Sequence, residues 1–316
     1  MSEVLSMLFF VLIFPGTLFL FFISTIAEYF DRKLHARLQN RVGPPWFQPV
    51  ADFIKLLGKE DIVPRNADRR MFKLMPVFAL VSTITAFLYI PPFSKQAPFV
   101  FEGDLIIIVY LLTIPTFTYF LGGWYSTSLY AMIGSARTLF QLFAYEIPLF
   151  LAVLAPALLA NTWSISGISA FYAQHPSYWP LNIIAFAVSL IALQGKLERI
   201  PFDIPEAETE IVAGMFTEYS GRLLAFFRLA VDIEMVVGAA LISALFLPFW
   251  NGYGALATFA IAILKIFFII TILCVIRTIL ARVKINQMID FCWKYLVPIA
   301  FVQIILNLII KEVFLI

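Results

Sequence analysis

The residues best suited to proton chemistry gather in one stretch near the middle of the chain, at 196–222. This stretch holds six of the chain's 20 acidic residues, although apolar sequence flanks it on both sides. Neighbouring carboxylates raise one another's pKa, which lets such a group take up and release protons near neutral pH. The stretch is therefore a candidate for proton exchange. Its acidic residues are Glu198, Asp203, Glu206, Glu208, Glu210 and Glu218.

Spacing predicts how part of this stretch folds. Pro201 and Pro205 break any regular helix before Glu206, so a helix beginning near Pro205 would place Glu206 and Glu210 on one face. Glu208 would then point away. The alternative is a solvated loop whose negative charges stabilise a helix N-terminus. Partial burial is favoured, because apolar residues bracket the acids: Ile200, Phe202, Ile204, Ile211 and Val212.

Ionisable residues inside apolar runs are the second group of candidates, since a charge in a membrane span is costly without a partner or water. Glu146 lies in such a run and is expected to be functional, although a structural pairing is the alternative. Arg228 and Asp232 are four residues apart and are expected to pair on one helix face. Glu234 lies off that face and needs another partner. Lys265 could exchange protons, or it could only snorkel or neutralise a distant carboxylate.

The composition indicates an integral membrane protein. Of 316 residues, 62% are hydrophobic and 13% are charged, whereas soluble domains have roughly 25% charged residues. The net charge of +2 gives no reason to expect nucleic acid as a partner. The two cysteines, Cys274 and Cys292, are not at metal-ligand spacing, so we expect no cofactor in this chain and assign any redox centre to another subunit. Glu3 precedes a long apolar run without a basic region, which we interpret as a first span and not a removed signal peptide.

Eight apolar runs are long enough, or nearly so, to cross about 30 Å of hydrocarbon. An open sheet could not satisfy its backbone in lipid, and the runs lack the alternation of barrel strands. We therefore predict an all-α membrane protein that forms a single domain over 1–316. The predicted spans are about 5–27, 74–90, 105–121, 137–160, 180–195, 223–247, 255–281 and 293–311.

Lys and Arg are concentrated in alternate connections, which predicts the orientation. The connection 28–73 carries ten of them, whereas 91–104 carries only Lys95. The connections 161–179 and 248–254 carry none. We therefore expect a multi-pass protein of the cell membrane with both termini outside. Its cytoplasmic connections would be 28–73, 196–222 and 282–292.

The first cytoplasmic connection contains a predicted amphipathic helix. Between Gln48 and Lys59, apolar residues recur at helical spacing, with Asp52, Lys55 and Lys59 off that face. This pattern is typical of a helix lying in the membrane interface. The preceding segment 41–46 contains a glycine and two prolines and cannot continue a helix. The apolar residues are Val50, Phe53, Ile54 and Leu57.

Three motifs, in order along the chain, resemble those of the membrane subunit at the heel of respiratory complex I, the H-type or quinone-chamber subunit. One comprises Arg199-Ile200-Pro201-Phe202-Asp203, the following acids Glu206, Glu208 and Glu210, and Thr217-Glu218-Tyr219-Ser220-Gly221. Another comprises Arg41-Val42-Gly43-Pro44, Gln48-Pro49-Val50-Ala51-Asp52, Lys55-Leu56 and Lys59-Glu60. The third runs from Arg137-Thr138 through Glu146-Ile147-Pro148. The likeness covers nearly the whole chain and includes an eight-span plan.

One departure refines the resemblance. The complex I subunit usually has a second Gly-Pro insert between its Arg-x-Gly-Pro and Gln-Pro sequences, whereas here Pro44 passes through Pro45-Trp46-Phe47 directly to Gln48-Pro49. This short form is similar to that of membrane-bound, energy-converting [NiFe] hydrogenases and of archaeal sulfane-sulfur reductases. In complex I the missing loop helps to shape the quinone entrance. The departure therefore favours a hydrogenase-type complex over a quinone site.

The resemblance implies a non-catalytic anchor and ion-coupling subunit. Its partners would be hydrogenase-like large and small subunits of a peripheral arm, which carry iron–sulfur clusters and a NiFe or related centre, and antiporter-like and small membrane subunits. In the family, the acidic loop and the acid of the fourth span begin a lateral chain of hydrated charges. The residues expected to couple protons or sodium ions are Glu146, Asp203, Glu206, Glu208, Glu210 and Glu218, extended by Asp232, Glu234 and Lys265. Those expected to face the arm are Arg32, Arg37, Arg41, Lys55 and Arg199.

Three alternatives stay open at this point. The chain could be the quinone-chamber subunit of a complex I-type oxidoreductase, with its site between 41–60 and 198–222. It could also be the membrane subunit of a sulfane-sulfur reductase. A different class is a stand-alone secondary transporter that uses Glu146 and Lys265, but the sequence lacks the inverted repeat that is typical of such proteins.

Overall fold

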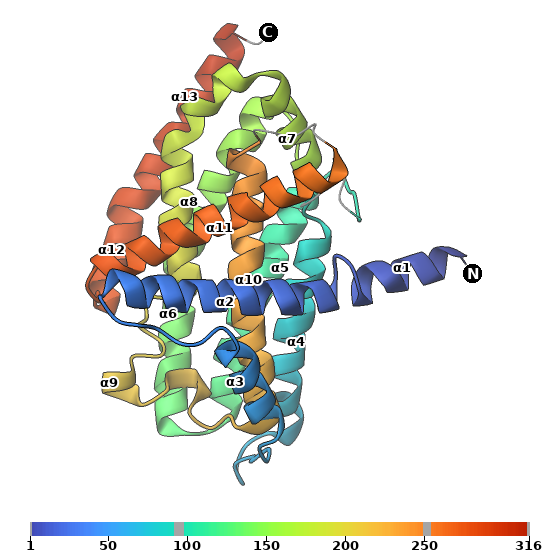
Figure 1. The fold of residues 1–316 in the computed structure, drawn as a ribbon. Coiled ribbons are helices and arrows are strands. Elements are labelled where there is room, and N and C mark those ends of the chain that lie inside the picture. Colours follow the sequence, from blue (N-terminus) through green and yellow to red (C-terminus); the bar gives the residue numbers. More distant parts are fainter. Residues whose placement is uncertain (1, 92–97, 249–253, 315–316) are drawn as a thin grey trace.

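The computed structural model describes residues 2–91, 98–248 and 254–314, and within them every regular element is a helix. Eight helices are long and apolar enough to cross a membrane, which confirms the predicted all-α membrane fold. Helices α4 (Arg69–Leu88), α5 (Asp104–Tyr125), α6 (Leu129–Ala160), α8 (Ile183–Lys196) and α10 (Gly221–Phe246) run along the long axis of the molecule (Figure 1).

Helix α10 is the centre of this bundle. It packs against α4, α8 and α11 (Ala255–Ile279), and also against α2 (Thr17–Leu38) and α3 (Gln48–Leu57). In its most apolar 18-residue segment, 83% of the residues are buried inside the protein. This share is higher than that of any other candidate span among the described residues. Acidic side chains on α10 therefore face other helices and not lipid.

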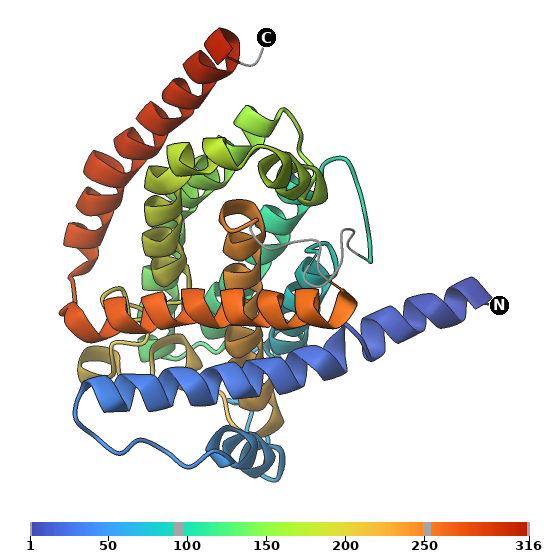
Figure 2. The ribbon, with the colours of Figure 1, turned by 45° about the horizontal axis from the view of Figure 1, so that its top comes forward.

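Two helices cross the bundle at a steep angle. Figures 1 and 2 both show α2 and α11 side by side across the other spans, and the two helices pack against each other. Helix α1 (Ser2–Leu12) projects away from the bundle beyond a break at Pro15 and Gly16. The predicted first span, 5–27, therefore differs from the structure, since proline cannot continue the backbone hydrogen-bond ladder and the second helix runs on to Leu38.

Several boundaries differ from the sequence prediction because helices continue into the predicted connections. Residues 28–38 of the predicted first loop belong to α2, and α12 (Ile285–Phe291) lies within the predicted loop 282–292. Helix α6 begins at Leu129 and not near 137, so Glu146 lies past its midpoint. Charged residues inside α2 are tolerated because they point at neighbouring helices, as described below. The chain ends in α13 (Val297–Phe314), which packs on α6 and α8.

The predicted interfacial helix is confirmed as α3, with Pro49 in its first turn. Phe53 packs edge-on against Phe21 of α2, with ring centroids 5.2 Å apart, while Ile54 remains exposed. The segment before α3 is not helical, as its glycine and prolines predicted. Helix α3 therefore lies against α2 and α10, beside the acidic stretch.

The acidic stretch is a structured loop fixed at its backbone. Gln141 of α6 donates hydrogen bonds from Nε2 to Gly195 O (2.7 Å) and Phe202 O (2.8 Å). The Val283 N–H donates to Pro201 O over 3.1 Å. Gly214 has a φ of +53°, and a Cβ there would lie 1.8 Å from Pro205 O, so only glycine fits. The remaining short elements of this region are α9 (Glu208–Ile211) and the 3-10 turn Gly214–Phe216.

Candidate functional site

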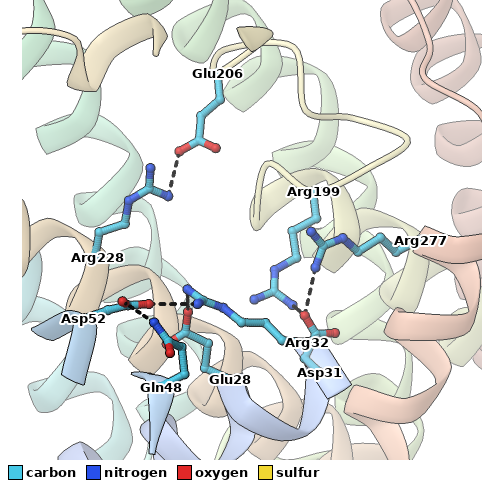
Figure 3. A network of polar contacts seen from close by, with 9 residues as sticks. All are labelled: Glu28, Asp31, Arg32, Gln48, Asp52, Arg199, Glu206, Arg228 and Arg277. Carbon is cyan, nitrogen blue, oxygen red and sulfur yellow. Dashed lines mark hydrogen bonds and ion pairs between the residues drawn. The ribbon is translucent and has the colours of Figure 1, made fainter. Parts of the chain in front are cut away.

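A polar cavity of about 360 Å³ lies where the acidic loop meets α2, α10 and the end of α11. Most of the side chains that line it are ionisable. Figure 3 shows several of them, contributed by α2, α10, α11 and the loop, together with Gln48 and Asp52 of the neighbouring helix α3. The ionisable lining consists of Glu28, Asp31, Arg32, Tyr119, Lys196, Glu198, Arg199, Asp203, Glu206, Arg228, Asp232, Glu234, Arg277 and Arg282.

Three acids of the loop each pair with an arginine from a different part of the bundle, and we call these contacts the loop ion pairs. Asp203 Oδ2 lies 2.8 Å from Arg282 Nε, just beyond α11. Glu206 Oε1 lies 3.2 Å from Arg228 Nη1 of α10, and Glu210 Oε2 lies 2.6 Å from Arg137 Nη1 of α6. The loop is thus held electrostatically on three sides.

Asp31 of α2 is a buried node at the edge of the cavity. Its Oδ2 accepts hydrogen bonds from Arg199 Nη1 and Arg277 Nη1, both over 2.9 Å (Figure 3). Its side chain is only 1% exposed, and its Oδ1 accepts no hydrogen bond from the described residues. One carboxylate therefore joins α2, α11 and the acidic loop, and two arginines compensate its charge.

A second polar group joins α2 to α3, and its members on α2, Glu28 and Arg32, line the same cavity. Arg32 forms an ion pair with Glu28 and donates to Asp52 Oδ2 over 3.1 Å. Gln48 Nε2 donates to Asp52 Oδ1 over 2.8 Å within α3, so the contact between Arg32 and Asp52 is what joins α3 to this group. Asp232 of α10 also lines the cavity and interacts electrostatically with Glu28, Arg32 and Arg199.

The deepest wall of the cavity contains a lysine and a glutamate, Lys196 and Glu234, each with a side chain only 1% exposed. Lys196 Nζ lies 3.2 Å from Glu234 Oε1, and Tyr119 donates its hydroxyl proton to Glu234 Oε2 over 3.2 Å. The Lys196 ammonium also donates to Leu112 O over 2.5 Å and lies 5.5 Å from the centre of the Tyr145 ring. We call Lys196, Glu234 and Tyr119 the buried cluster.

Glu198 lies in the loop, two residues after the lysine of the buried cluster. Burial raises the pKa of its carboxyl well above the ordinary value, and the charges of Glu206 and Glu234 raise it further, while Lys196 lowers it. Its Oε1 is buried and accepts no hydrogen bond within the part of the chain that the structure describes. Glu198 is therefore a group that holds its proton at pH values where an exposed glutamate is ionised.

Two predictions about this region are wrong. Glu206 and Glu210 do not share a helix face, because α9 begins only at Glu208 and leaves Glu206 in the preceding turn. Arg228 does not pair with Asp232; it reaches Glu206 instead, while Asp232 contacts Glu28. In both cases a long-range partner replaced the local one that helical spacing suggested. The side chain of Glu208, predicted to point away, lies outside the described residues.

Other predicted residues, Glu210 among them, do not line the cavity. Glu146 is half-buried on α6, next to Tyr145 in sequence, and interacts electrostatically with Lys196 and Glu234. Lys265 is half-buried on α11, and Glu218 is half-buried before α10. Of the residues expected to face a peripheral arm, Arg32 and Arg199 line the cavity. The others lie at the end of α2, after it and on α3: Arg37, Arg41 and Lys55.

Sequence reasoning missed Lys196 as a functional candidate, as well as Glu28, Asp31 and Arg277. Their signal was present but local: each is a charged residue at the end of an apolar run, where snorkelling into the interface is the ordinary expectation. Asp31 meets Arg277 only because α2 and α11 pack side by side across the other spans. Their pairing could not be read from spacing, because 246 residues separate them in sequence.

This fold and site define the class of protein: a multi-pass membrane protein with a charged internal cavity and no group of three or more metal-binding side chains among its described residues. The pattern of the NADH dehydrogenase family matches residues 9–308. The chain belongs to this family.

Relatives support the same assignment. The H-type subunit of the NADH-quinone oxidoreductase of Carboxydothermus hydrogenoformans is 34% identical over 299 residues, covering 92% of this chain and 85% of that protein. Its counterpart in Geobacillus kaustophilus is 36% identical over 296 residues, covering 90% and 88%. A chain of the membrane-bound sulfane sulfur reductase, an archaeal respiratory membrane complex, superposes with a TM-score of 0.83 at 29% identity, covering 92% of this chain and 96% of that one. The chain is thus a membrane subunit of a complex I-like respiratory enzyme.

Proposed function

We propose that this chain couples electron transfer in a peripheral arm to proton or sodium translocation in neighbouring membrane subunits. The observation that carries the proposal is the cavity, because two of the loop ion pairs, Asp203–Arg282 and Glu206–Arg228, and the buried cluster line one space. A charge change at the loop then acts on Glu234 and Glu146 within the bundle. At an effective dielectric constant of 20, two charges 4 Å apart interact by about 4 kcal/mol, enough to change a protonation state.

The complex is of the hydrogenase or sulfane-sulfur-reductase type in this proposal. The shortened passage from Pro44 to Gln48 and the likeness to the archaeal sulfane sulfur reductase chain support it. The partners are then peripheral large and small subunits that carry iron–sulfur clusters and a NiFe or related centre, together with antiporter-like subunits. Arg37, Arg41 and Lys55 are the basic residues best placed to meet the arm, because Arg32 and Arg199 already hold internal carboxylates.

The second candidate function is a quinone site, which the names of the relatives in Carboxydothermus and Geobacillus favour. The volume of about 360 Å³ lies within the range of ligand pockets, about 300–1,000 Å³. However, such pockets are lined mainly by apolar and aromatic side chains, whereas ionisable side chains dominate here. This lining suits water and protons better than an apolar ring.

The test is to neutralise the proposed coupling acids one at a time in the intact complex: Glu206→Gln, Glu210→Gln and Glu146→Gln. We expect electron transfer to continue while the ion gradient formed per electron falls severalfold, because the charge change at the loop no longer reaches a titratable group. Glu312→Gln, at an exposed position on α13, is the matched control and should leave the ratio unchanged. An undiminished gradient in all three variants would overturn the proposal.

A further inference from the structure

Lys196 occupies an unusual position for a lysine in a membrane bundle. Its ammonium group lies at the C-terminal end of α8 and contacts Leu112 of α5, Tyr145 of α6 and Glu234 of α10. The side chain is 1% exposed, so it cannot snorkel to water as lysines near helix ends usually do. Four helices therefore meet around a single buried positive charge.

The three N–H groups of Lys196 are used unequally. One donates to Leu112 O, and the ammonium also faces the ring of Tyr145. The contact with Glu234 Oε1, at 3.2 Å, is an ion pair that is poorly aligned as a hydrogen bond, and this oxygen has no hydrogen-bond donor among the described residues. The contact that compensates the charge is thus longer than the hydrogen bond to Leu112 O.

More carboxylates surround Lys196 than it can neutralise. Glu234 of α10, Glu146 of α6 and Glu198 of the loop all interact electrostatically with it. Glu146 Oε2 and Glu198 Oε1 are buried and accept no hydrogen bond from residues the structure describes. Several unpaired charges cannot coexist in a low-dielectric interior, so the group must retain protons and its titrations are coupled.

We propose that Lys196 is a positioning residue whose positive charge is exchanged between Glu234 and Glu146 as protons move through the bundle. This inference rests on the coupling function proposed above. When Glu234 takes up a proton from the cavity, it becomes neutral and its ion pair with Lys196 ends. The charge of Lys196 is then available to Glu146, which releases its own proton and becomes the ionised partner. One proton enters and one leaves, so the net charge of the group is conserved.

The geometry supports such an exchange. Glu234 on α10 is the contacting acceptor, and Glu146, which follows Tyr145 on α6, interacts electrostatically with Lys196 and has a buried oxygen without a hydrogen-bond donor among the described residues. A lysine suits this role because its ammonium is a point charge on a flexible stem, whereas the planar guanidinium of arginine favours a fixed bidentate partner. Tyr119 of α5 donates to the second oxygen of Glu234 and stabilises its ionised form.

The decisive variant removes both charges of the pair at once, Lys196→Met with Glu234→Gln, in the intact complex. Replacing a buried ion pair by neutral residues is often neutral or stabilising, so we expect the complex to assemble and transfer electrons. If Lys196 exchanges between acids, the ion gradient per electron falls at least tenfold. A gradient restored to the wild-type level would mean that the pair is only structural and would overturn the inference.

A milder variant decides the question if the double variant does not assemble. Tyr119→Phe removes one donor from Glu234 without changing any charge, and it should shift the pH profile of the ion-to-electron ratio. An unshifted profile would mean that Glu234 does not titrate during turnover and would overturn the inference. The experiments distinguish the exchange by Lys196 from the coupling function on which it rests. A retained gradient in the double variant, beside a lost gradient in Glu146→Gln and Glu206→Gln, rejects the exchange by Lys196 and keeps the coupling function.

Discussion

The loop ion pairs and the buried cluster use the same chemistry in opposite surroundings. The carboxylate of Glu210 is 60% exposed and the guanidinium of Arg228 is 50% exposed, whereas Lys196 and Glu234 are each 1% exposed. Exposed ion pairs contribute about 0–1 kcal/mol, because water competes for both partners. Breaking a buried pair costs about 3–5 kcal/mol, because one charge is left without solvent or a partner.

Ion pairs in the two regions therefore differ in the free energy needed to open them. The pairs of Glu206 and Glu210 can open and reform at little cost, because at least one partner in each is half exposed or more. Opening the buried pair while Glu234 is ionised costs about 3–5 kcal/mol. Breaking an exposed ion pair therefore requires little free energy, whereas breaking the buried pair requires much more unless Glu234 is protonated.

The largest expected effect comes from breaking the buried pair on one side. Lys196→Met leaves the Glu234 carboxylate without its cation and should destabilise the protein by about 3–5 kcal/mol, or force Glu234 to bind a proton. Thermal unfolding of the purified complex measures the loss. Lys294→Met is the control, since its pair with Asp290 is 64% and 60% exposed and should contribute no more than about 1 kcal/mol. Equal losses in both variants would contradict the contrast between the two regions.

An intermediate effect is expected at Glu198, which lies between the two regions. Because its folded pKa is raised, chiefly by burial, the folded state binds its proton more tightly than the unfolded state does. The associated stability is present at low pH and is lost as the pH rises from the ordinary value of 4.5 through the raised folded pKa. Glu198→Gln should remove this alkaline loss, so that stability falls less steeply with rising pH. Unfolding midpoints measured across pH check the prediction, and parallel profiles would contradict it.

The smallest effect is expected at the loop ion pairs. Arg137→Gln removes the partner of the largely exposed Glu210 and should cost less than about 1 kcal/mol of stability. The cost should shrink further at high salt, because mobile ions screen exposed pairs. Melting temperatures at low and high ionic strength measure both. A large, salt-independent loss would show that this pair behaves like the buried one.

Much of the fold was predictable from the sequence because each membrane span corresponds to a continuous run of apolar residues. Apolar runs located all eight spans, and the periodicity of 48–59 located the interfacial helix α3. The boundaries were less predictable. Helix α2 extends to Leu38 through Glu28, Asp31 and Arg32. Glu28 and Arg32 pair with each other, and the distant residues Arg199 and Arg277 compensate Asp31, which a count of apolar residues does not detect.

The site was predictable in location but not in pairing. Charge density alone identified the acidic loop. Glu234 lies on a different helix face from Arg228 and Asp232, so it was expected to have a partner from elsewhere in the chain. That partner is Lys196, which the sequence places 38 positions earlier and which looked like an ordinary residue at the end of a span. Tertiary packing decides which acid meets which base, and helical spacing predicts only contacts within one helix. The predicted outer location of both termini and the docking role of Arg37, Arg41 and Lys55 stay predictions.

The volume of the cavity has a consequence for how protons would travel. Since a water molecule takes up about 30 Å³ in the liquid, 360 Å³ offers room for on the order of ten of them. Glu206 of the loop and Glu234 of the buried cluster both line this space, so water within it would connect the two carboxyl groups by hydrogen bonds. Glu146 does not line the space, so a proton that passes on to Glu146 would have to leave the cavity.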